Sequence, residues 1–248
     1  MINVSDLGIK FRMGKRQSSR AFSLLFERSH NQERPSGEFW ALRHVSFIVE
    51  SGETVGIIGR NGSGKSTLLR VVAGIYPPDE GTVSVDAEVS TLFGLGTGFN
   101  AELSGRDNIY LNGVMMGLSK KQIDEISDTV IEFAELGDFI DMPVRTYSSG
   151  MRVRLGFAIA MHSYKDIVLI DEIMGAGDAA FRQKAEAEMD RIMGEKTVLL
   201  VSHDMGAIRR FANEVIWLNK GVIAAMGEPK AVIEQYLLAS KVKAAARE

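Results

Sequence analysis

Short apolar runs recur along the chain and predict buried strands. Three are compact enough for strands covered on both faces of a parallel sheet: residues 54–58, 167–170 and 197–201. Residues 2–11 alternate between apolar and polar side chains, and residues 41–49 read as another strand. Residues 82–93 predict two short strands on either side of Asp86. The pattern therefore favours a core built on β-structure.

Apolar residues spaced three and four apart predict helices in the middle of the chain. From residue 102 to about residue 161 the pattern is mostly helical, most clearly at 105–117 and 120–136. Residues 181–193 predict a charged amphipathic helix between two of the buried runs. Strands that alternate with helices in this way indicate an α/β fold with a helical insertion.

The last part of the chain predicts a hairpin followed by a helix. Residues 215–218 and 222–225 read as an antiparallel pair joined by a turn, and Pro229 suits the first turn of a helix that runs to about Ala246. We expect one domain over residues 1–248. Its expected parts are a core at about 1–99 and 162–228, a helical subdomain at about 100–161 and a C-terminal helix at about 229–248.

The composition limits the classes of function. With 45% hydrophobic and 25% charged residues, a chain of 248 residues can bury the core of one globular α/β domain. A net charge of −3 gives no reason to expect a nucleic-acid partner. The sequence has no Cys, which excludes disulfides, thiolate catalysis and Cys-based metal sites and fits the cytosol.

The sequence predicts no membrane span of its own. No apolar run approaches the roughly 20 residues that a spanning helix needs. A signal peptide is not expected, because Asp6, Lys10 and Arg12 interrupt any apolar stretch near the N-terminus. We expect a protein kept where ATP is available, with any membrane link through a partner or an amphipathic surface.

Residues 59–66, Gly-Arg-Asn-Gly-Ser-Gly-Lys-Ser, form a glycine-rich stretch between an apolar strand and an apolar helix. Glycines let backbone N–H groups turn toward an anion, and the helix adds the positive end of its dipole. Lys65 can reach the β- and γ-phosphates of a nucleotide, and Ser66 can ligate Mg²⁺. The alternative is a glycine-rich turn that binds nothing, which the flanking strand and helix disfavour. The expected contacts to a nucleoside triphosphate are Gly59, Arg60, Asn61, Gly62, Ser63, Gly64, Lys65, Ser66 and Thr67.

Two carboxylates, Asp171 and Glu172, end the apolar run at 167–170. The carboxyl end of a strand is where α/β sheets place their ligands. We expect Asp171 to hold Mg²⁺ and Glu172 to polarise the attacking water. A solvated turn is the alternative for an isolated Asp-Glu pair, and the glycine-rich stretch upstream disfavours it.

Two further motifs indicate a family. Residues 147–151 read Tyr-Ser-Ser-Gly-Met, and residues 201–204 read Val-Ser-His-Asp after the next buried run. With the phosphate loop at 59–67, this order resembles the ATP-binding-cassette (ABC) ATPases. The resemblance implies a P-loop NTPase of the ABC type, with a mostly parallel RecA-like core sheet, N-terminal antiparallel strands and a helical subdomain. It also implies that ATP and Mg²⁺ are the cofactors.

The resemblance assigns roles to single residues. Ser148 and Gly150 keep the family's positions for contacting a γ-phosphate bound by the other protomer of a homodimer, whereas Tyr147, Ser149 and Met151 depart from the usual Leu-Ser-Gly-Gly-Gln. His203 matches the histidine that senses the γ-phosphate. Asp178 matches the aspartate that crosses the dimer interface. The implied catalytic residues are Glu172, His203 and Lys65.

The stretches 98–109, 147–155 and 201–205 look like the branch of this family that exports polysaccharides. That resemblance implies an ATPase subunit that energises export of lipid-linked O-antigen, capsule, teichoic acid or another cell-wall glycan. It would work as a homodimer with two copies of a separate membrane protein, on the cytoplasmic face of the inner membrane. The alternatives are the ATPase of an importer or of a drug or lipid exporter, and a soluble ABC ATPase without a transport role.

One position departs from the family pattern, and the residue that stacks on the adenine has more than one candidate. Gly94 stands where the family has Gln or Glu, so we expect hydrolysis to proceed without that contact, with substitution by Asn100 as the alternative. The adenine is expected to stack on Phe11, with Phe39 or Trp40 as alternatives.

The segment at residues 10–34 is basic, with seven Lys or Arg against two acidic residues. Phe22, Leu25 and Phe26 share one face of a short predicted helix within it. Such a helix can lie at a membrane surface. We expect it to contact the membrane protein or the lipid headgroups, and a helix folded onto its own domain is the alternative.

Overall fold

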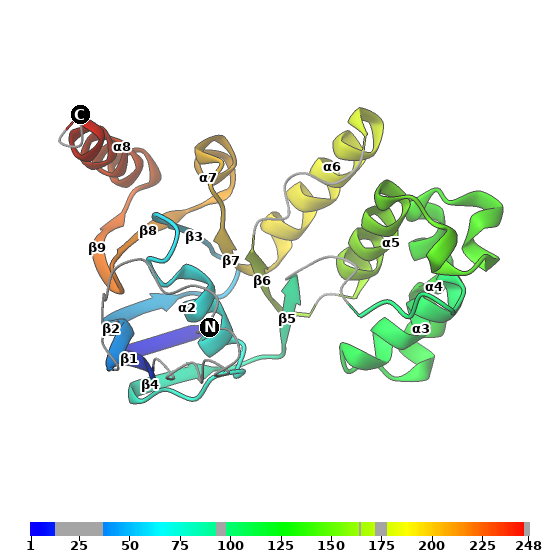
Figure 1. Cartoon of the computed structure of the whole chain (residues 1–248), viewed down its shortest axis with the longest axis horizontal. Coiled ribbons are helices and arrows are strands. Elements are labelled where there is room, and N and C mark those ends of the chain that lie inside the picture. Colours follow the sequence, from blue (N-terminus) through cyan, green and yellow to red (C-terminus); the bar gives the residue numbers. More distant parts are fainter. Residues whose placement is uncertain (13–36, 93–97, 164, 172–177, 246–248) are drawn as a thin grey trace, which may run out of the picture.

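The computed structural model describes residues 1–12, 37–92, 98–163, 165–171 and 178–245. Two sheets and a group of helices make up this part of the chain, and Figure 1 shows how they are arranged.

The larger sheet is mostly parallel, as the apolar runs predict. It has six strands in the order β5-β6-β7-β3-β8-β9, and only the β8–β9 pair is antiparallel. Every residue of β3 and β7 is buried, which explains why these runs have no charged residues and only one polar side chain each, Thr54 and Thr197. The strands are β5 (Val89–Leu92), β6 (Ile167–Asp171), β7 (Thr197–Val201), β3 (Thr54–Ile58), β8 (Glu214–Asn219) and β9 (Val222–Gly227).

The smaller sheet is antiparallel and has the order β2-β1-β4. Its strands are β1 (Ile2–Arg12), β2 (Glu38–Val49) and β4 (Glu80–Val85). The two short strands expected around Asp86 therefore exist but belong to different sheets, because β4 pairs with β1 while β5 pairs with β6. The fold class expected from the sequence is confirmed.

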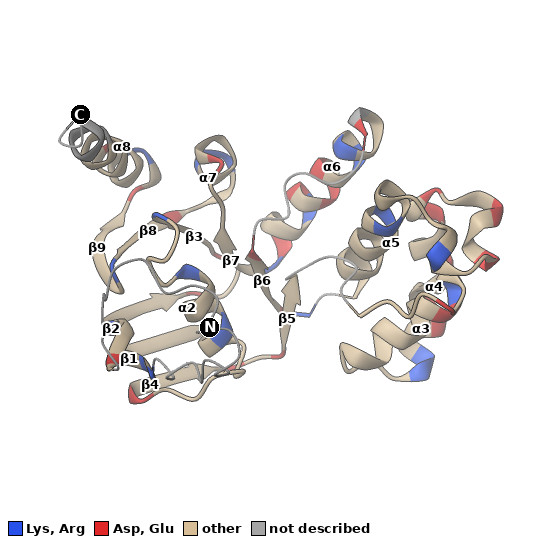
Figure 2. Cartoon of the chain, viewed as in Figure 1, with Lys and Arg blue, Asp and Glu red and all other residues tan. Residues whose placement is uncertain are grey.

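Two groups of helices complete the fold. Those that follow core strands are α2 (Lys65–Val72), α6 (Ala179–Glu195), α7 (Met205–Phe211) and α8 (Pro229–Ala245). A second group, here called the helical unit, comprises α3 (Gly105–Met115), α4 (Lys120–Ala134), η1 (Gly137–Asp141), η2 (Val144–Thr146) and α5 (Ser149–His162). In Figure 1 the helical unit lies at one end of the molecule beyond β5 and α6, and α8 lies at the opposite end. Figure 2 shows acidic and basic residues interspersed along α6.

Serine side chains begin the helices of the helical unit. Ser104 caps α3 by accepting from the N–H of Asp107, and Ser119 forms a capping box with Gln122 at the start of α4. Ser148 caps α5. These bonds satisfy N–H groups that have no intrahelical partner, so each helix begins at a defined residue.

Two hydrophobic clusters hold the elements together. One lies between the antiparallel sheet, α2 and one face of the parallel sheet, and includes Leu42, Ile57 and Leu68. The other joins the opposite face of the parallel sheet to the helical unit through fully buried aromatic rings such as Phe157 and Phe181. The helix that follows the phosphate loop, α2, is held in the first cluster through Leu68 and Leu69.

Across the described ranges, none of the helices combines the length and the apolar character that crossing a membrane requires.

Candidate functional site

The carboxyl ends of β3, β6 and β7 meet at one edge of the parallel sheet. Val201 of β7 pairs with Ile57 of β3 on one side and with Asp171 of β6 on the other. The phosphate loop leaves β3 just after this register point, and His203 follows β7 by two residues. This is the edge at which α/β sheets bind ligands.

The glycines of the phosphate loop have conformations and surroundings that exclude a side chain. Gly59 has φ +152° and Gly64 has φ +109°. A Cβ on Gly59 would lie 2.3 Å from the carbonyl oxygen of Leu218, and one on Gly64 would lie 2.8 Å from that of Ala41. Close approach of β8 and β2 therefore fixes the loop and requires glycine at both positions.

Lys65 is buried at the start of α2, with 7% of its surface exposed. Its ammonium donates to the carbonyl oxygens of Gly59 at 2.9 Å and Arg60 at 3.2 Å, so the charge is held inside the loop. Ser63 Oγ is also buried and has no hydrogen-bond partner among the described residues. A buried cation beside an unsatisfied hydroxyl group fits an anionic ligand with several acceptor oxygens.

Ser66 and Asp171 come together from positions 105 residues apart. Ser66 Oγ donates to Asp171 Oδ2 at 2.9 Å, which joins the start of α2 to the end of β6. A hydroxyl and a carboxylate oxygen are ligands of the kind that Mg²⁺ prefers, usually alongside water and substrate phosphates. The two residues present thus fit the metal that the sequence predicts here.

His203 lies on the turn between β7 and α7 and its side chain is exposed. The turn is fixed by its neighbours, since Asp204 accepts from the N–H groups of Gly206 at 2.7 Å and Ala207 at 3.3 Å. Ser202 Oγ in turn accepts from the N–H of Asp204 at 3.0 Å. The capped turn holds His203 at the same edge of the sheet as the phosphate loop.

Residues 147–151, here called the signature segment, lead into α5. Tyr147 is buried, its hydroxyl donates to the carbonyl oxygen of Phe139 at 2.6 Å, and burial raises its pKa. A Cβ on Gly105 would lie only 2.2 Å from that hydroxyl oxygen. The departure from leucine at Tyr147 is therefore a packing feature of the helical unit.

Ser148 and Gly150 remain at the surface of the helical unit. Ser148 Oγ accepts from the N–H of Met151 at 3.2 Å, and a Cβ on Gly150 would meet only Ser148 Oγ, at 3.8 Å. In the part of the chain that the structure describes, no hydrogen bond joins either residue to the phosphate loop of the same chain. Within one chain, the structure therefore does not bring Ser148 and Gly150 together with the predicted ATP contacts of the phosphate loop.

The aromatic candidates for the adenine contact divide between the two faces of the antiparallel sheet. Phe11 pairs with Phe39, and its ring lies 6.0 Å from that of Phe39 and 5.8 Å from that of Tyr76. Trp40 pairs with Lys10 on the other face, where the Arg43 guanidinium lies 5.0 Å from its ring. Phe11 packs on the cluster that contains Leu42, the residue that lies against Gly64 of the phosphate loop. Phe11 and Phe39 therefore share the face of the sheet that carries this cluster, and Trp40 lies on the other face.

Several predicted residues lie outside the described ranges. They are Glu172, Gly94 and the basic segment from residue 13 onward, with Phe22, Leu25 and Phe26. Asn100 is described, and its Oδ1 accepts from the N–H of Glu102 at 3.0 Å, so it stabilises a turn before α3.

Asp178 is placed as the N-cap of α6, where it accepts from the N–H of Phe181. Arg154 of α5 donates to the same carboxylate. Arg154 is not among the residues that the sequence motifs predict, and its position four residues after Gly150 is the local signal that points to it.

Comparisons with known proteins agree with this geometry. A family model described as "ABC transporter" matches residues 42–175. The chain is 44% identical over 210 residues to the O-antigen export system ATP-binding protein RfbB of Myxococcus xanthus, covering 84% of this chain and 48% of that protein. It is 45% identical over 223 residues to the teichoic acids export ATP-binding protein TagH of Lactococcus lactis subsp. lactis, covering 90% of this chain and 47% of that protein.

A shorter relative is matched over most of its length. The O-antigen export system ATP-binding protein RfbB of Klebsiella pneumoniae is 42% identical over 218 residues, which cover 88% of this chain and 85% of that protein. The chain spans about half the length of the two relatives above.

Solved structures share the fold. One is an ATP-binding cassette in a dimeric, post-hydrolysis state with ADP and Pi, with a TM-score of 0.71, 21% identity and coverage of 92% of this chain and 99% of that one. Another is an ATP-binding subunit of an ABC transporter, with a TM-score of 0.72, 20% identity and coverage of 96% and 94%.

Proposed function

This chain belongs to the ABC transporter family, and we propose that it is the ATP-hydrolysing subunit of an exporter for a lipid-linked polysaccharide, such as O-antigen or teichoic acid. The names of relatives at 42–45% identity support the choice of cargo. The contact of Ser66 with Asp171 beside buried Lys65 supports the chemistry, because it unites a phosphate-binding and a metal-binding function at one edge of the sheet.

The phosphate loop, residues 59–67, would hold ATP, with Lys65 at the β- and γ-phosphates and Mg²⁺ on Ser66 and Asp171. When bound, Mg²⁺ supplies charge neutralisation between these phosphates. Glu172 would act as the general base toward water, and His203 would orient toward the γ-phosphate. Phe11 is the proposed contact of the adenine ring, since it packs on the cluster whose Leu42 lies against Gly64 of the phosphate loop.

The proposed assembly is a homodimer beside two copies of a membrane protein, at the cytoplasmic face of the inner membrane. Ser148 and Gly150 of one protomer would complete the ATP site of the other, with Asp178 near the interface. Their surroundings support this role, because Ser148 is exposed and a Cβ on Gly150 would meet only Ser148 Oγ among the described residues. The RecA-like core at about 1–99 and 162–228 and the helical subdomain at about 100–161 would then be functional units.

Phosphate release tests the enzymatic part of the proposal. The parent protein should hydrolyse ATP, and Glu172→Gln should lower turnover by about 10²–10⁴-fold while ATP still binds, because a general base typically contributes that much. Lys65→Ala should lose nucleotide affinity instead. A Glu172→Gln protein that turns over at the parent rate would refute the assignment of the base.

The cargo is tested separately in cells. Deletion of this chain should trap a completed lipid-linked glycan on the cytoplasmic face of the membrane, and the parent chain should restore export while Lys65→Ala should not. The chain should also copurify with a membrane protein. Normal glycan at the cell surface after deletion would refute the cargo and leave the ATPase assignment standing.

A further inference from the structure

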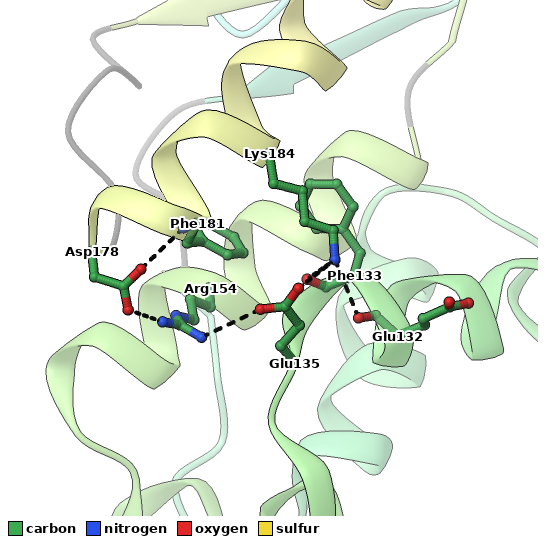
Figure 3. Close-up of polar contacts among 7 residues, drawn as sticks. All are labelled: Glu132, Phe133, Glu135, Arg154, Asp178, Phe181 and Lys184. Carbon is green, nitrogen blue, oxygen red and sulfur yellow. Dashed lines mark hydrogen bonds and ion pairs between the residues drawn. The ribbon is translucent and has the colours of Figure 1, made fainter.

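Four charged side chains join α6 to the helical unit, and we call them the interlock: Glu135, Arg154, Asp178 and Lys184 (Figure 3). Glu135 follows α4 and Arg154 lies on α5, whereas Asp178 and Lys184 belong to the start of α6. Arg154 of the helical unit binds the start of α6, and Lys184 of α6 binds the end of α4. The interlock therefore spans the boundary between the helical unit and α6.

Lys184 binds the C-terminal end of α4. Its ammonium donates to the carbonyl oxygen of Phe133 at 3.2 Å and to Glu135 Oε1 at 2.9 Å. A cation is favourable there because the last carbonyl groups lack intrahelical partners and carry the negative end of the dipole. Glu135 ends the helix in the left-handed region, with φ +54°. Lys184 thus fixes the end of α4 on α6.

Arg154 binds the N-terminal end of α6. Its guanidinium donates to Asp178 Oδ2 and lies 3.9 Å from Glu135 Oε2, while Asp178 Oδ1 accepts from the N–H of Phe181 at 3.0 Å. The Phe181 N–H and the Arg154 charge both lower the pKa of Asp178. Only 21% of the Arg154 side chain is exposed, so its direction is set by packing. Arg154 therefore fixes the orientation of the Asp178 carboxylate.

An aromatic layer lies beneath the charges. The rings of Phe133, Phe157 and Phe181 have centroids 5.7–6.0 Å apart and are buried. The Arg154 guanidinium lies 5.2 Å from the Phe181 ring, and the Lys184 ammonium lies 4.7 Å from the Phe133 ring. These close-packed rings hold the start of α6 against α4 and α5.

The interlock lies between two parts of the proposed mechanism. Arg154 follows Gly150 by four residues, about one turn of α5, and Asp178 follows Asp171 by seven residues. We propose that Arg154 is a positioning residue that couples the signature segment to Asp178 and the start of α6. This inference rests on the proposed function. When ATP on the partner protomer contacts Ser148 and Gly150, Arg154 transmits the position of α5 to Asp178 and the start of α6.

Steady-state kinetics test the coupling. Arg154→Ala should lower kcat about tenfold, because a small misplacement of reacting groups is costly, while KM and the equilibrium Kd for ATP stay within about twofold of the parent. Arg154→Lys keeps the charge without the planar fork and should recover part of kcat. Arg106→Ala is the matched control, because it removes an Arg–Asp pair, with Asp141, that lies wholly within the helical unit.

The outcomes separate this inference from the proposed function. Loss of kcat in Arg154→Ala alone, with normal ATP affinity and a melting temperature like that of Arg106→Ala, would support the coupling. An Arg154→Ala protein with the parent kcat, or an equal loss in Arg106→Ala, would overturn it. A parent protein that hydrolyses no ATP would overturn the proposed function, and the inference with it.

Discussion

The phosphate loop and the signature segment both lead into the N-terminus of a helix, but only the former is enclosed by its own chain. Lys65 is 7% exposed, and the loop touches residues of β2 and β8 so closely that a Cβ on Gly59 or Gly64 would collide with them. Ser148 and Ser149 are exposed, and a Cβ on Gly150 would meet almost nothing. Of these two segments that lead into a helix, the phosphate loop is thus enclosed by described residues of its own chain and the signature segment is exposed.

The difference shows where each segment finds its partners. The groups of the phosphate loop are already oriented by one chain, with Lys65 bonded to carbonyl groups and Ser66 to Asp171. The signature segment keeps its small residues at a surface, and no described residue of the same chain imposes a steric need for Gly150. A glycine that its own fold does not require is explained if a second protomer approaches it, which is what the proposed dimer supplies.

The largest expected contrast is in nucleotide binding. Lys65→Ala should weaken ATP binding to the isolated subunit by about 10- to 100-fold, since a hydrogen bond to a charged group is worth about 1.5–3 kcal/mol. Ser148→Ala should leave that affinity within about twofold while lowering turnover. Equilibrium binding of a fluorescent ATP analogue, measured beside phosphate release, gives both quantities. Equal losses of affinity in the two variants would remove the distinction between the regions.

A second contrast concerns stability. Gly64→Ala should destabilise the fold by about 1–3 kcal/mol because of its left-handed backbone, whereas Gly150→Ala should stay within about 0.5 kcal/mol of the parent. In a chain of this size 1 kcal/mol corresponds to about 2–4 °C in Tm. Thermal melts of both variants test this. A Gly150→Ala melt as low as that of Gly64→Ala would show that the signature segment is also fixed by its own chain.

Much of this arrangement follows from local patterns in the sequence. The runs at 54–58, 167–170 and 197–201 are buried strands, and parallel strands place their carboxyl ends at one edge, which accounts for the contact of Ser66 with Asp171. Local rules sufficed here because strand direction and the glycine pattern determine the outcome.

Other features depend on registers and long-range pairs that local patterns do not encode. An irregularity between the Ile9–Leu42 and Lys10–Trp40 pairs sends Trp40 to the face away from Phe11, so one extra residue decides which aromatic faces the site. The pairing of Arg154 with Asp178 and of Lys184 with Glu135 depends on how the helical unit packs. Tyr147, read from the sequence as a departure, is explained only by the packing around Gly105.

The smallest expected effect concerns the link between the two regions. The pKa of Asp178 is lowered from its ordinary value of 3.8, chiefly by the N–H of Phe181 and then by Arg154. A carboxylate whose pKa is lowered in the folded state stabilises the protein at pH values above its ordinary pKa. This stabilisation is lost as the pH falls through the lowered pKa. Asp178→Asn should therefore melt slightly earlier at neutral pH and lose less Tm on acidification than the parent. Parallel curves of Tm against pH would contradict this.

If the open segment of one protomer completes the enclosed site of another, cysteines placed in the two regions should join two protomers, and the absence of cysteine from the sequence allows a direct test. Two tagged proteins carry single cysteines at exposed positions of the two regions, Asn61→Cys in one and Ser149→Cys in the other, both with Glu172→Gln. After mixing and mild oxidation, we expect a disulfide-linked pair of the two proteins to form with Mg²⁺ and ATP, and little of it to form without nucleotide. If both proteins bind ATP and no mixed disulfide forms, the shared site is contradicted.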